Sequence, residues 1–225
     1  MAAVEPKLNL AKVVGELLKR PVDTVCNLIE SLLGEPFKVG GAALADQIAY
    51  WQWTNRVSIL ERFERIRQER KLAVHILPPD FLLPFIRECG DTSDEQLQEA
   101  WARLLSAAVE SDVNQHIGFV HVLRELSPTD AKVIQAIIKH CPGFTEESDV
   151  DRTKRVEELA AYLNLPAASV RLSINNLHRL GLLNVTGLKL SGFARSLLRV
   201  CLTTSDELDQ YLERERNLKS ARLRA

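Results

Sequence analysis

The stretch from Val156 to Leu198 constrains the fold of this chain more than any other part of the sequence. Leu159 and Leu163 are four residues apart, which places them on one face of a helix, and residues 164–166, Asn-Leu-Pro, interrupt that helix. A second apolar stripe follows at steps of four, three and three residues, formed by Val170, Ile174, Leu177 and Leu180. Two short helices joined by a tight turn predict a helix-turn-helix.

The residues after this motif predict the wing of a winged helix-turn-helix. Gly181 stands just past the second helix, where left-handed backbone is common. Residues 182–185 and 188–190 then flank Thr186-Gly187 as in a short hairpin, and residues 191–194 begin another helix. The predicted fold class is therefore mainly α: an N-terminal helical domain, a winged helix-turn-helix with one short β-hairpin, and a C-terminal helix.

Helix start signals organise the rest of the chain. Residues 127–130, Ser-Pro-Thr-Asp, combine an N-cap serine, a proline at the first helical position and an early carboxylate. Ser93 and Gln96 have capping-box spacing. We expect a long helix from about Leu44 to Leu72 and a loop from Cys141 to Lys154. The predicted domains are 1–125, helical; 126–202, winged helix-turn-helix; and 203–225, an amphipathic helix.

The second helix of the motif is the candidate nucleic-acid reader, because in DNA-binding members of this fold it enters the major groove. The candidate contacts are Ser169, Arg171, Ser173, Asn175, His178, Arg179 and Lys189. Two features weigh against this reading. Leu172 stands where regulators commonly carry an arginine, and residues 127–200 hold only 10 Lys and Arg against 7 Asp and Glu. Winged helices also serve as protein-docking modules or scaffolds, so both interpretations stay open.

No motif predicts catalysis, a metal or a cofactor. The four cysteines are scattered without a CxxC pair, and His116 and His121 are five residues apart, on different helix faces. Cys89 follows a predicted helix, whose dipole would raise the pKa of its thiol. The chain lacks a phosphate-binding glycine loop and a nucleophile elbow. We therefore lean against an enzyme, although an active site built from distant residues would leave no motif.

The chain also shows no signal for a membrane. No segment is apolar enough to span a bilayer, residues 1–20 do not resemble a secretory signal, and we expect a cytoplasmic protein. Residues 50–53, Tyr-Trp-Gln-Trp, fit an aromatic core cluster better than an interfacial anchor.

Two segments resemble a known family. Residues 94–107 contain Leu97, Trp101-Ala102 and Leu104-Leu105, and residues 116–131 contain Leu-Ser-Pro before an acidic residue. Both are similar to the core of the abortive-infection alpha family, and the likeness extends over roughly residues 35–200. The resemblance implies a bacterial protein linked to phage defence or to a toxin–antitoxin-like arrangement. It supplies no catalytic residues, and its matching positions imply structural roles, with Trp101 and Leu104 in a core.

These observations lead to a first hypothesis and two alternatives. The first is a non-enzymatic interaction protein of an abortive-infection system, with a protein partner or self-association and no evident small-molecule substrate. The second is a nucleic-acid-binding transcriptional regulator that acts through its winged helix. The third, a toxin enzyme acting on RNA or nucleotides, rests on the family context alone.

Overall fold

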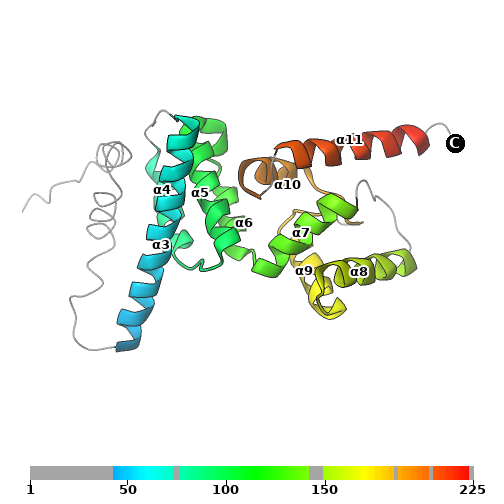
Figure 1. Ribbon diagram of the computed structural model, residues 1–225, viewed down its shortest axis with the longest axis horizontal. Coiled ribbons are helices and arrows are strands. Elements are labelled where there is room, and N and C mark those ends of the chain that lie inside the picture. Colours follow the sequence, from blue (N-terminus) through cyan, green and yellow to red (C-terminus); the bar gives the residue numbers. More distant parts are fainter. Residues whose placement is uncertain (1–42, 73–76, 142–148, 185–186, 203–204, 223–225) are drawn as a thin grey trace, which may run out of the picture. The chain divides into compact units, whose positions relative to one another are not determined.

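The computed structural model describes residues 43–72, 77–141, 149–184, 187–202 and 205–222, and these are mainly helical (Figure 1). Residues 1–42 of the predicted N-terminal domain lie outside the described residues. The helices are α3 (Ala43–Arg70), α4 (Pro79–Cys89), α5 (Glu95–Glu110), η1 (Asp112–Asn114), α6 (Ile117–Glu125), α7 (Pro128–His140), α8 (Asp149–Leu163), α9 (Ala167–Arg179), α10 (Gly192–Leu197), η2 (Leu198–Leu202) and α11 (Ser205–Arg222). None of the described helices combines the length and apolar character needed to cross a membrane.

The chain divides into two compact units, Met1–Arg124 and Glu125–Ala225. In the first unit the long helix α3 packs along α5 and contacts α4 (Figure 1). Its core joins Ile59 and Phe63 of α3 to Phe85 of α4 and Trp101 of α5, all buried. The Phe85 and Trp101 rings meet edge to face with their centroids 5.2 Å apart, a favoured aromatic geometry. Trp101 and Leu104 thus lie in the core, as the family resemblance implied.

Two predicted details of the first unit are wrong. The N-cap of α5 is Asp94, whose side chain accepts a hydrogen bond from the Leu97 amide, and not Ser93. The Asp94 carboxylate, one residue after Ser93, accepts hydrogen bonds from the first free amides of the helix as well as a serine would. The aromatic residues near the start of α3 do not form a core cluster either, because Tyr50 and Trp51 are 57% and 42% exposed.

The second unit begins with the predicted helix start at Ser127, which is confirmed. The Ser127 side chain accepts from the Asp130 amide, and the Asp130 carboxylate accepts from the Ser127 amide at 2.9 Å. Asp130 also accepts a hydrogen bond from Asn176 Nδ2 at 2.9 Å, which joins the start of α7 to α9. This reciprocal cap fixes where α7 begins, and it ties that end of α7 to α9.

The predicted break between the two helices of the motif is also confirmed. Helix α8 ends at Leu163, Asn164 takes a left-handed φ of 52°, and α9 begins at Ala167. Gly181 follows α9 with a φ of 68°. The predicted loop from Cys141 to Lys154 is too long, since α8 already begins at Asp149. Acidic residues at this helix start favour earlier helix formation through the helix dipole.

The predicted β-hairpin is not formed. Leu183 and Leu190 make a single antiparallel bridge, and the described residues contain no strand. In a strand successive side chains point to opposite faces, so a strand with one exposed face alternates buried and exposed residues. Here Leu182 and Leu183 are consecutive and both buried, as are Leu188 and Leu190 after the turn. The segment is therefore a buried loop, and the wing of the predicted winged helix is not supported.

Helix α11 closes the second unit over this loop. Leu208 and Tyr211 are fully buried, and α11 packs against α7 and η2. The Leu190 amide donates to the Tyr211 hydroxyl oxygen at 3.4 Å. The apolar stripe of the last helix thus packs within its own unit.

Candidate functional site

Helix α9 has one buried and one exposed face. Val170, Ile174 and Leu177 are buried. The exposed positions recur at helical spacing on the other side: Ala168, Arg171, Leu172, Asn175 and Arg179. We call these five residues the α9 outer face. Its most unusual member is Leu172, an apolar side chain that is 71% exposed.

The structure brings only some of the predicted nucleic-acid contacts onto this face. Arg171, Asn175 and Arg179 are exposed, while Ser169 and His178 are half-buried. Ser173 is buried. Lys189 lies outside α9, in the loop that follows it, and is half-buried.

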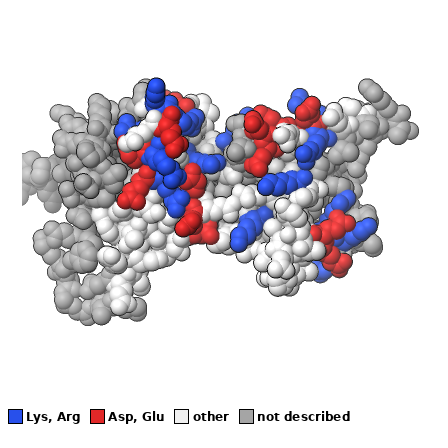
Figure 2. Space-filling view, viewed as in Figure 1, with Lys and Arg blue, Asp and Glu red and all other residues white. Residues whose placement is uncertain are grey.

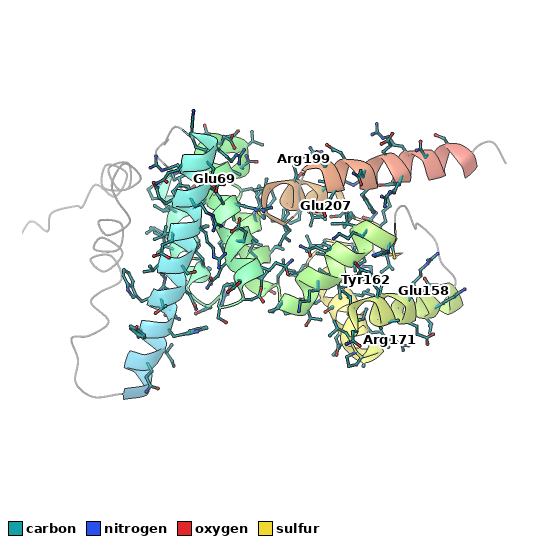
Figure 3. The ribbon with its side chains drawn as sticks, viewed as in Figure 1. Glu69, Glu158, Tyr162, Arg171, Arg199 and Glu207 are labelled. Carbon is teal, nitrogen blue, oxygen red and sulfur yellow. The ribbon has the colours of Figure 1, made fainter. Side chains whose placement is uncertain are left out.

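Two of the three predicted cations are held by carboxylates. Arg179 Nη2 binds the Glu125 carboxylate, and its guanidinium also donates to Asn176 Oδ1. Lys189 Nζ lies 2.7 Å from Glu215 Oε1. Arg171 contacts no carboxylate among the described residues, and Figure 3 shows it at the edge of the unit on α9. Positive and negative side chains are interleaved on the face of each unit that Figure 2 shows, so that face carries no uniform basic patch.

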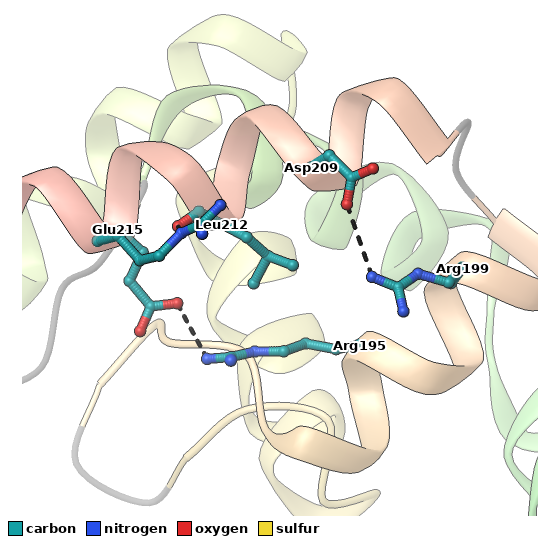
Figure 4. Close-up of a pocket in the computed structure, with 6 residues that line it drawn as sticks. Arg195, Arg199, Asp209, Leu212 and Glu215 are labelled. Atoms are coloured by element: carbon teal, nitrogen blue, oxygen red, sulfur yellow. Dashed lines mark hydrogen bonds and ion pairs between the residues drawn. The ribbon is translucent and has the colours of Figure 1, made fainter.

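A second feature of this unit is a cavity of about 400 Å³ beside α11. Its lining residues are Arg195, Arg199, Asp209, Leu212, Glu215 and Arg216. Figure 4 shows Arg195 and Arg199 reaching from α10 and η2 towards α11, where Asp209 and Glu215 lie. A cavity of this size falls within the range of small-molecule sites, about 300–1,000 Å³.

The two carboxylates of the cavity differ in their surroundings. Glu215 is buried between two cations, with Arg195 Nη2 at 2.9 Å from one carboxylate oxygen and Lys189 Nζ at 2.7 Å from the other. Asp209 is mostly exposed and lies 3.6 Å from Arg199, which is longer than a hydrogen bond. Glu215 is therefore a fixed part of the wall, while the contact between Asp209 and Arg199 is loose.

No group of three or more His, Cys, Asp or Glu side chains in the described part of the chain could hold a metal ion. Cys89, Cys141 and Cys201 are buried and form no disulfide with one another. Burial raises the pKa of the Cys89 thiol to about 12, so desolvation rather than the predicted helix dipole is the main cause.

A comparison with models of protein families identifies the family of this chain. The family model for abortive infection alpha matches residues 54–224, most of the chain. The chain belongs to the abortive infection alpha family. The resemblance in residues 94–107 and 116–131 is thus confirmed, and membership is consistent with a component of an abortive-infection system. Searches of curated proteins and of solved structures found no match.

The cavity of this abortive infection alpha protein was not predicted from the sequence. Arg195 and Arg199 are four residues apart, a spacing that places both on one helix side. That spacing was the one available signal. The carboxylates opposite them come from α11, and only the docking of α11 brings the two sides together.

Proposed function

We propose that this abortive infection alpha protein is a non-enzymatic interaction component of a phage-defence system, and that its α9 outer face binds a protein partner. The observation that carries the proposal is Leu172, 71% exposed in the middle of that face. Single exposed leucines are common on proteins, but this one sits between an arginine and an asparagine that are exposed with it.

The chemistry of the face defines the partner that would fit it. Leu172 offers an apolar anchor, and Arg171 offers a guanidinium that contacts no carboxylate among the described residues. Arginine is enriched among the residues that contribute most to protein–protein binding energy, and burial of an exposed leucine against a partner adds a hydrophobic contribution. The complementary surface is a protein with an apolar pocket for Leu172 and a carboxylate opposite Arg171.

The same features disfavour nucleic acid as the partner. Proteins that bind a phosphate backbone gain affinity from Lys and Arg side chains that contact the phosphates. Arg179 and Lys189 are already bound to Glu125 and Glu215, and Ser173 is buried. In a complex with DNA, the exposed Leu172 would also lie against the polar surface of the groove.

A phage challenge of cells that carry the native operon tests this function. We expect wild-type protein to reduce the efficiency of plating of at least one phage in a broad panel, and Leu172→Glu to restore plating. The substitution is at an exposed position, so its effect on stability should stay within about 0.5 kcal/mol. The matched control is Val113→Glu, the same kind of change at an apolar residue that is 85% exposed in the first unit.

Two outcomes would overturn the proposal. One is unaltered infection across the whole panel with wild-type protein. The other is full protection by the Leu172→Glu variant at normal cellular abundance, because a partner surface centred on Leu172 has to be disrupted by a buried charge.

A nucleic-acid-binding regulator is the second candidate function, favoured by the exposed Arg171 and Asn175 on the second helix of the motif. It predicts binding to duplex DNA or single-stranded RNA that weakens steeply with salt and is lost in Arg171→Glu. Fluorescence anisotropy at low and moderate salt measures this. Weak binding that is indifferent to Arg171 would eliminate the regulator.

A further inference from the structure

We infer that the cavity beside α11 binds a small phosphorylated ligand through Arg195, Arg199 and Arg216. Figure 3 shows Arg199 and Arg171 on separate parts of the second unit, so this site is distinct from the α9 outer face. The inference does not depend on the function proposed for that face.

The charges around the cavity favour an anion. The cavity lining holds three arginines, Arg195, Arg199 and Arg216, and two carboxylates, Asp209 and Glu215, which leaves a net charge of +1. Like charges gathered at one site repel each other, and an anionic ligand removes that repulsion.

Two of the arginines are available to a ligand. Arg199 lies 3.6 Å from Asp209, beyond hydrogen-bonding distance, and both side chains are more than half exposed. The Arg216 guanidinium makes one hydrogen bond among the described residues, from Nε to the Leu212 carbonyl oxygen at 3.4 Å. Each guanidinium therefore retains N–H donors that can reach a bound oxyanion.

Arg195 forms the fixed wall of the site. Its Nη2 donates to Glu215 at 2.9 Å, while its buried Nε has no hydrogen-bond acceptor among the described residues. The Arg195 side chain as a whole is one-third exposed, so part of it remains accessible from the cavity.

The local backbone is unusual at the same place. Arg199 belongs to the π-helical turn η2, Leu198–Leu202, which directly follows α10. Short π-helical turns occur frequently at functional sites, because they displace a side chain from regular helical spacing.

The lining also limits the class of ligand. Among the described residues that line the cavity, Leu212 is the one apolar side chain, and none is aromatic. A nucleobase or another large apolar group would have little to pack against. Arginine forks match the several oxygens of a phosphoryl group, and a phosphoryl group offers three acceptor oxygens where a carboxylate offers two. The site therefore fits a compact phosphorylated molecule that is recognised mainly through its phosphoryl groups.

Isothermal titration calorimetry of the full chain with inorganic pyrophosphate tests the site. We expect Arg199→Gln and Arg216→Gln each to weaken binding at least about tenfold, since each removes one charge-assisted contact. Arg199→Lys keeps the charge without the planar fork and should fall between wild type and Arg199→Gln. Arg214→Gln is the matched control, an exposed arginine on α11 that lies outside the cavity lining, and should bind as wild type.

Citrate at the same ionic strength distinguishes phosphoryl recognition from general anion binding. Weaker binding of citrate than of pyrophosphate supports the inference. It is overturned by pyrophosphate that gives no binding at millimolar concentration, by citrate that binds as tightly, or by Arg214→Gln that weakens binding as much as the cavity variants do. Thermal melts of each variant confirm that it is folded at the titration temperature.

Discussion

The Nε atom of Arg56 in α3 donates a hydrogen bond to the carbonyl oxygen of Ile86 in α4, across 2.9 Å. The last carbonyl groups of a helix have no partner within the helix, so an outside donor has to satisfy them. Asn55, next to Arg56, donates its amide to the Gly90 carbonyl oxygen at 2.8 Å. Two neighbouring polar residues of α3 thus satisfy the end of α4, and both are buried in doing so.

Gly90→Ala tests how tightly this arrangement is packed. A β-carbon at position 90 would lie 2.6 Å from Cζ of Arg56, so the guanidinium would have to move and lose its contacts with α4. We expect the free energy of unfolding to fall by about 1–3 kcal/mol, the usual effect of leaving buried hydrogen-bonding groups unsatisfied. Urea denaturation followed by tryptophan fluorescence measures it.

The matched control for that variant is Gly192→Ala at the start of α10. A β-carbon there meets nothing within 4 Å, and alanine favours a helix over glycine. Its stability should equal or slightly exceed that of wild type. Equal stability of the two variants would contradict the close approach of Arg56 to Gly90.

Glu215→Gln tests the buried ion-pair cluster of the second unit. The substitution preserves the size of the side chain but leaves Lys189 and Arg195 without the carboxylate that binds both. Removal of one member of a buried ion pair typically destabilises by about 3–5 kcal/mol. Because Arg195 is one-third exposed, we expect the free energy of unfolding to fall by about 3 kcal/mol, the lower end of this range.

Asp209→Asn is the control for the cluster. Asp209 is on the same helix, but it is exposed and lies 3.6 Å from an exposed arginine. Exposed pairs of this kind contribute about 0–1 kcal/mol, so the variant should melt close to wild type. A Glu215→Gln protein as stable as Asp209→Asn would show that Glu215 is not the structural centre of the cluster.

The Cys89 thiol should be protected from alkylating reagents in the native protein. Burial raises its pKa to about 12, whereas a cysteine in an unfolded chain has a pKa of about 8.5. At pH 8 we expect iodoacetamide to modify Cys89 only in urea, as measured by peptide mass spectrometry. Rapid modification of the native protein at this position would contradict its burial.

The same shift determines how stability depends on pH. The folded state holds the proton more tightly than the unfolded state, so the contribution of Cys89 is complete below about pH 8.5. It falls as the pH rises from there towards about 12. A Cys89→Ala variant should therefore lose less stability than wild type over this alkaline range.

Local signals in the sequence predicted the helices better than the loops between them. Ser127 and Pro128 predicted the start of α7, because a cap is decided by neighbouring residues. The break before Pro166 was predicted for the same reason. The hairpin prediction failed because the leucines around residues 182–190 are buried on several sides, and burial of that kind depends on α11.

The candidate sites were predictable to different degrees. Of the candidate contacts named from the sequence on this helix, Arg171 and Asn175 are exposed, whereas Ser173 is buried. The pairing of Lys189 with Glu215 and of Arg179 with Glu125 joins residues far apart in the chain and left no local signal. The cavity beside α11 could not be predicted for that reason.

The most direct test of the proposed function is photocrosslinking at position 172 in phage-infected cells. A photoreactive amino acid replaces Leu172 in the full chain, and its adducts are treated separately with nuclease and with protease. We predict a discrete adduct that resists nuclease, is destroyed by protease, and disappears when Arg171→Glu is introduced. A nuclease-sensitive adduct, or the same pattern with the crosslinker at Val113, would contradict a protein-binding role for the α9 outer face.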